Sequence, residues 1–132
     1  MGYYTCKILC CALKKDTPEN VINTLKALVN NDNMPSDSVL SEEDFITFRY
    51  GLHGYTYSYF IPHNSMEYDE NLGWRVFCNG ESKDYEDEFE KCLEWLKPYI
   101  RCGIGVDEMY AMTIGEGEND TTIYKLNDGN EY

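Results

Sequence analysis

The sequence has no long apolar run and no basic leader, and these two absences bear on where the protein is expected to be. The run Ile8-Leu9-Cys10-Cys11-Ala12-Leu13 is far shorter than the roughly 18 apolar residues of a membrane span. No basic stretch precedes it, as one would in a signal peptide. We therefore expect no membrane partner and a location in the cytoplasm.

Basic residues are also scarce. The chain has 11 Lys and Arg against 24 Asp and Glu, which gives a formal net charge of −13. Residues 1–29 carry four lysines against Asp16 and Glu19, so this stretch is +2 and the other 103 residues carry −15. Such a field repels nucleic acid and attracts basic partners or cations. It excludes direct nucleic-acid binding and favours a protein partner with a basic surface.

The six cysteines are too few and too scattered for a disulfide scaffold or a zinc site. Their first gap is Cys6-x₃-Cys10, and Cys78, Cys92 and Cys102 are far apart, whereas zinc sites need closely paired ligands. We expect free thiols and no metal or other cofactor. A catalytic pair of Cys10 or Cys11 with His53 or His63 is the alternative, but no local signature supports it.

Hydrophobic periodicity predicts one α+β domain that spans residues 1–132. Two apolar stripes at helical spacing predict helices with core residues Leu25, Leu28, Phe89, Leu93 and Leu96. The expected elements are a strand at 3–13, a helix with Thr17 as its N-cap and Pro18 as its first residue, a hairpin at 45–61, a loop at 62–73, a strand at 74–79, a helix at 84–97 and a final hairpin at 109–126.

This order is β-α-β-β written twice, which suggests a duplication. It predicts a mostly antiparallel six-stranded sheet with two helices on one face. Ferredoxin-like and effector-binding domains have the same pattern of elements, although fold alone does not determine function.

Two acidic runs are candidate partner-binding residues because they are the densest in the chain. The alternative is that they form a solvated face that keeps the protein soluble, and catalytic use of paired carboxylates is not favoured. The runs are Glu42, Glu43 and Asp44 in a predicted loop, and Asp84, Glu86, Asp87 and Glu88 at a predicted helix start.

Tyrosines alternate along the predicted hairpin at 45–61. Tyr55, Tyr57 and Tyr59 share one face of its second strand, and Tyr50 lies on the strand opposite. Either the helices cover this aromatic face, or it is open and serves as a ligand platform or an interface, including one in a homodimer.

Three segments resemble a group of small bacteriophage-encoded proteins of unassigned biochemical function. They are MGYYT, KKDTPENVINTLKAL, and DYEDEFEKCLEWLKPYI followed by a hairpin that ends in TTIYKL. The resemblance implies a host-cell setting and a role such as that of anti-CRISPR inhibitors of host defence, and it assigns no catalytic residue. We thus expect a non-enzymatic inhibitor that binds a host protein. The alternative is a protein that binds or sequesters a small ligand, either a nucleotide signal or a hydrophobic cation.

Overall fold

The computed structural model describes residues 4–53, 63–83, 87–115 and 121–126. The described elements are six strands, three α-helices and one short 3₁₀ helix. In chain order they are β1 (Tyr4–Leu13), α1 (Glu19–Val29), α2 (Glu42–His53), β2 (Ser65–Asp69), β3 (Gly73–Lys83), α3 (Glu88–Leu96), the 3₁₀ helix η1 (Lys97–Tyr99), β4 (Ile100–Cys102), β5 (Met109–Ile114) and β6 (Thr121–Lys125).

The six strands form one sheet in the order β2-β3-β1-β5-β6, and the short β4 pairs with the end of β1. All of these pairings are antiparallel, which confirms the predicted α+β class and six-stranded antiparallel sheet. Taken without α2, β4 and β6, the order of elements and strands is the β-α-β-β-α-β order of ferredoxin-like domains. The duplication of β-α-β-β units stays a prediction.

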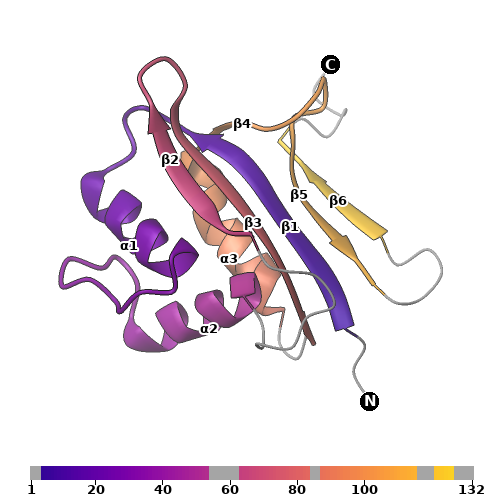
Figure 1. Cartoon of the computed structure of the whole chain (residues 1–132), viewed down its shortest axis with the longest axis horizontal. Helices are drawn as coiled ribbons and strands as arrows, with labels where there is room; N and C mark the ends of the chain where they lie inside the picture. Colours follow the sequence, from indigo (N-terminus) through magenta and orange to yellow (C-terminus); the bar gives the residue numbers. More distant parts are fainter. Residues whose placement is uncertain (1–3, 54–62, 84–86, 116–120, 127–132) are drawn as a thin grey trace.

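Strand β1 lies inside the sheet, and its alternating burial separates a covered face from an open face. Lys7, Leu9 and Cys11 are buried, whereas Ile8 and Cys10 between them are partly exposed. Since neighbouring side chains on a strand point to opposite faces, one face carries the core. Figure 1 shows the helices gathered beside the sheet, and the buried cluster joins all three of them to the odd-numbered residues of β1.

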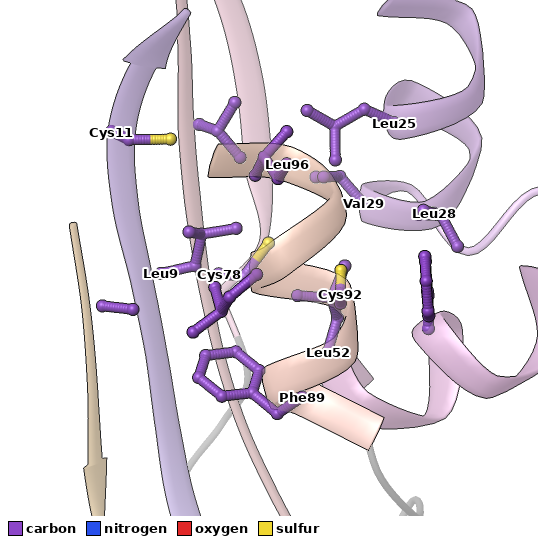
Figure 2. Packing of buried hydrophobic residues seen from close by; sticks show 14 of the residues in the cluster. Leu9, Cys11, Leu25, Leu28, Val29, Leu52, Cys78, Phe89, Cys92 and Leu96 are labelled. Carbon is purple, nitrogen blue, oxygen red and sulfur yellow. The ribbon is translucent and has the colours of Figure 1, made fainter. Parts of the chain in front are cut away.

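Helices α1 and α3 supply the predicted apolar stripes. Leu25 and Leu28 of α1 and Phe89, Leu93 and Leu96 of α3 are all buried, as expected. In Figure 2, Phe89 and Cys92 of α3 lie beside Leu9 and Cys78 of the sheet, and Leu25 and Val29 of α1 point towards Leu96 of α3. The core therefore forms between these helices and one sheet face.

The predicted hairpin at 45–61 is wrong over its first half, because residues 42–53 form α2. The Ser41 hydroxyl accepts a hydrogen bond from the Asp44 backbone N–H at 3.1 Å and caps the helix start. Phe45, Phe48 and Leu52 are buried, at i, i+3 and i+7. Aromatic and β-branched content suggested strands, but the helical spacing decided the outcome, so three α-helices replace the two predicted.

The predicted loop at 62–73 is also wrong in part, because it contains the edge strand β2. Asp69 starts the turn into β3, where its Oδ1 accepts hydrogen bonds from the backbone N–H groups of Asn71 and Leu72 at 2.8 and 2.9 Å. Gly73 completes the turn with a φ of 80°, a value that favours glycine. Strand β2 is thus a strand that the sequence did not predict, and the second half of the predicted hairpin, at 54–61, lies outside the described residues.

Candidate functional site

The described residues of the two acidic runs, which in the second run are Asp87 and Glu88, do not form one surface. Glu42, Glu43 and Asp44 are exposed on the first turn of α2. Gly51, near the other end of α2, lies against the backbone of Glu88, so that a Cβ added to it would lie 2.8 Å from the Glu88 carbonyl carbon. A helix rises about 1.5 Å per residue, so the two runs are separated by most of the length of α2.

One residue of the second run that was predicted to face solvent is buried. The Asp87 side chain is exposed, but Glu88 is only 7% exposed and lies at the buried start of α3. The assignment of Glu88 to a solvent-facing run is therefore wrong, because the close approach of α2 at Gly51 covers it. Asp84 and Glu86 lie outside the described residues.

Of the predicted aromatic face, the structure describes only Tyr50. Tyr50 lies on α2 and is half-buried, which places it on a helix and not on a strand. Tyr55, Tyr57 and Tyr59 lie outside the described residues. The prediction of an aromatic strand face is therefore wrong at Tyr50 and stays a prediction at the other three positions.

The open face instead carries an apolar row across three strands. Strand register pairs Cys6 with Ile114, and Ile8 with Met112, which in turn pairs with Ile123 on β6. Ile114 is 41% exposed and Ile123 is 48% exposed. We name Cys6, Ile8, Met112, Ile114 and Ile123 the open-face row. A contiguous exposed apolar group on a sheet is typical of an interaction surface.

A hollow of about 400 Å³ lies at one end of the open face, beside β4 and the turn between β2 and β3. Its walls come from β1, β2, β3 and β4 and from the segment after β4. The lining is largely apolar and includes two thiols and two arginines: Cys10, Arg75, Phe77, Arg101, Cys102 and Ile104 are among its residues. Ligand pockets have volumes of roughly 300–1,000 Å³, so this hollow is large enough for a small organic molecule.

Both arginines of the hollow are held by contacts at its rim. Arg101 donates a hydrogen bond from Nη2 to the Leu72 carbonyl at 2.5 Å, which ties β4 to the β2–β3 turn. The Nη2 atom of Arg75 lies 3.7 Å from Oε2 of Glu67, and both side chains are substantially exposed. An exposed ion pair of this kind contributes little stability and leaves Arg75 able to meet another anion. The formal charge of the lining is +1, in a chain whose net charge is −13.

Cys6, Cys10 and Cys11 are poor nucleophiles. Burial raises the pKa of Cys10, and burial together with the nearby Glu81 carboxylate raises the pKa of Cys6. Burial and neighbouring thiols raise the pKa of Cys11 well above its usual range. Because the thiolate is the reactive form, these shifts disfavour nucleophilic catalysis at the cysteines that the sequence suggested.

The histidines form no pair with these thiols among the described contacts. The His53 Nε2–H donates to the Leu28 carbonyl at 2.5 Å, and its Nδ1 accepts from the Asn64 side chain at 2.9 Å. The backbone N–H of His63 donates to the Asn79 side chain. His53 therefore joins the end of α2 to α1 and to the residue before β2, which is a structural role.

Lys7 is a buried cation that sequence reasoning missed. It is 1% exposed, and its Nζ lies 5.9 Å from the centre of the Phe89 ring. Alternate residues of a strand point to the same face, so Lys7 lies on the same face of β1 as Leu9 and Cys11. This parity is the signal that could have identified it.

Within the described residues, no group of three or more His, Cys, Asp or Glu side chains is placed to hold a metal ion. The described helices include none that is long and apolar enough to cross a membrane. Comparison with protein-family models, curated proteins and solved structures found no match for the chain.

Proposed function

We propose that this protein is a non-enzymatic binding protein that inhibits a host-defence protein by attaching to it through the open-face row. The observation that supports the binding surface is the row itself, which places Ile114 and Ile123 in solvent on adjacent strands. Burying apolar side chains contributes about 25 cal/mol per Å², so a partner that covers them gains affinity. The inhibitory setting rests on the resemblance to phage proteins.

The partner is a protein with a basic surface. Exposed acids lie at the β2 edge of the sheet, which β3 separates from the row: Glu70 faces solvent, and Glu67 is paired with Arg75. The Leu72 and Asn71 N–H groups lower the pKa of Asp69, which keeps this carboxylate ionised. An apolar centre with a charged rim is the usual anatomy of a protein interface, and the charge speeds encounter with a partner of opposite sign.

Substitution of the row tests the proposal. We expect Ile114→Lys with Ile123→Lys to abolish capture of the partner from lysate of the bacterial host, because two charges would be buried on contact. Ile46→Lys is the matched control, since Ile46 is 52% exposed on α2, on the helix side of the molecule. Equal capture by the row variant, or equal loss with Ile46→Lys, would overturn the proposal.

The acidic run on α2 requires its own variant. Glu42→Gln, Glu43→Gln and Asp44→Asn remove three exposed charges without adding apolar surface. We expect this variant to capture the same partner at low salt. If it alone loses the partner while the row variant retains it, the contact surface is the start of α2 and not the sheet.

A further inference from the structure

We infer that the hollow at the end of the sheet is a binding site for a small organic anion, with an apolar body and one carboxylate, sulfonate or phosphate group. This goes beyond the proposed function, because the hollow is lined by neither Ile114 nor Ile123. It also requires ligand chemistry opposite to that of a basic partner. Three properties of the hollow support it: shape, charge and the way its walls are held.

The shape follows from the short strand β4. Ala12 pairs with Cys102, and the register of β1 and β4 shifts between Ala12 and Leu13, so the pairing is irregular there. The small Ala12 side chain leaves room between the larger side chains around it. On β3, Phe77 pairs with Cys10 and is 37% exposed, which gives the hollow an aromatic wall. An apolar molecule can therefore lie along β1 with its body against Phe77.

The charge is positive where most of the molecule is negative. Arg75 of β3 pairs with Ala12 of β1. Arg101 is the second residue of the short strand β4, which also lines the hollow. Glu67 is the one acid in the lining, and it already lies 3.7 Å from Arg75. Arg101 uses one guanidinium nitrogen for the Leu72 carbonyl, and no other hydrogen bond joins it to a described residue. A guanidinium group has five N–H donors, so Arg101 retains donors that suit an oxyanion.

The walls are held before any ligand arrives. The Arg101 contact fixes the β2–β3 turn against β4, and Ile104 is held by two backbone hydrogen bonds with Met109 at 2.8 and 3.0 Å. A site that is already formed loses little conformational entropy on binding, which favours affinity for a small ligand.

The test uses anilinonaphthalene sulfonate, a fluorescent aromatic anion, and its uncharged parent N-phenylnaphthylamine. We expect saturable binding of one sulfonate molecule per chain and binding at least about tenfold weaker for the uncharged parent, as loss of a charged hydrogen bond predicts. Arg75→Gln and Arg101→Gln should each weaken sulfonate binding by about tenfold. Arg49→Gln, on α2, should leave it unchanged.

Cysteine alkylation locates the bound probe within the open face. Cys10 and Cys102 line the hollow, whereas Cys6 lies on the same face in the open-face row. We expect the sulfonate to slow alkylation of Cys10 and Cys102 by N-ethylmaleimide while Cys6 reacts at its original rate. Protection of Cys6 alone would place the probe on the row and overturn the inference.

Filling the hollow separates this site from the protein interface. Ala12→Leu should abolish sulfonate binding, and Ile123→Lys should leave it intact, with the thermal midpoint of each variant measured as a check on folding. Sulfonate binding that persists in a folded Ala12→Leu variant would overturn the inference. So would equal affinity for the charged and uncharged probes. Neither result would alter capture of a protein by the row.

Discussion

At the scale of single residues, the core contains groups that could carry charge but are held neutral or enclosed. Cys11, Cys78 and Cys92 are buried, and burial raises the pKa of each thiol. Lys7 lies in the same core, over the Phe89 ring. These side chains pack in the core, and the raised pKa values of the three thiols make stability depend on pH.

Stability should fall at alkaline pH because of the buried thiols. The pKa of Cys92 rises from 9.0 to about 12 on folding, so the native state retains a proton that the unfolded state loses in this window. Its contribution is complete below pH 9.0 and is lost as pH rises towards about 12, by up to about 1.4 kcal/mol per pH unit. Denaturant titrations at about pH 7 and about pH 10.5 measure this fall.

The thiol variants separate this effect from the titration of other groups. Cys92→Ala should reduce the slope of stability against pH, and Cys102→Ala, at a partly exposed position, should retain the wild-type slope. An identical slope in all three proteins would show that other groups cause the alkaline loss.

A substitution at Leu93 tests whether α3 packs its apolar side chains into the core. Its side chain is 2% exposed in α3, and Leu93→Ala should lower the free energy of unfolding by about 2–5 kcal/mol through lost burial and a cavity. Glu94→Ala is the control at the next, exposed position and should change it by less than about 0.5 kcal/mol. Equal midpoints in chemical denaturation would show that α3 does not bury Leu93.

At the scale of elements, two glycines allow α2 to pack very close to its neighbours. Gly80 of β3 lies under the end of α2, where an added Cβ would be 2.5 Å from the Leu52 carbonyl oxygen. Gly51 lies against the start of α3. Real Cβ atoms do not approach backbone this closely, so both positions need glycine to keep the elements packed.

Gly51→Ala should destabilise the protein although alanine is the better helix former. The propensity gain is about 1 kcal/mol, but a Cβ 2.8 Å from the backbone of Glu88 and Phe89 forces α2 and α3 apart. Overpacking of this kind costs about 1–3 kcal/mol, so we expect a net loss of stability. Ile46→Ala, exposed on the same helix, is the control, and a clear rise in melting temperature for Gly51→Ala would contradict this packing.

At the scale of the whole molecule, charge and the open face together determine association. Two copies that each carry −13 repel one another, which disfavours the homodimer that an apolar face would otherwise allow. The lining of the hollow, with a formal charge of +1, is the exception on this surface. A protein partner and a small anion can therefore bind at different parts of one face.

Ionic strength should affect oligomeric state and partner binding in opposite directions. The screening length falls from about 10 Å at 0.1 M salt to about 3 Å at 1 M, so affinity for a basic partner should fall as salt rises. Light scattering should report a monomer at low salt. A stable dimer at low salt that Ile123→Lys disperses would show that a second copy covers the row, which contradicts the proposed host partner.

The sequence by itself determined the α+β class and the elements whose local pattern is strong. The apolar stripes predicted α1 and α3 because helical periodicity reflects which side faces the core, and strand-rich composition predicted β1 and β5. Tertiary structure alone decided the rest. Gly51 and Gly80 allow the helix at 42–53 to pack closely against α3 and β3. Glu88 became buried under that helix. Arg75 and Arg101 meet at one hollow because strand pairing joins segments far apart in the chain, and no local pattern records such a pairing.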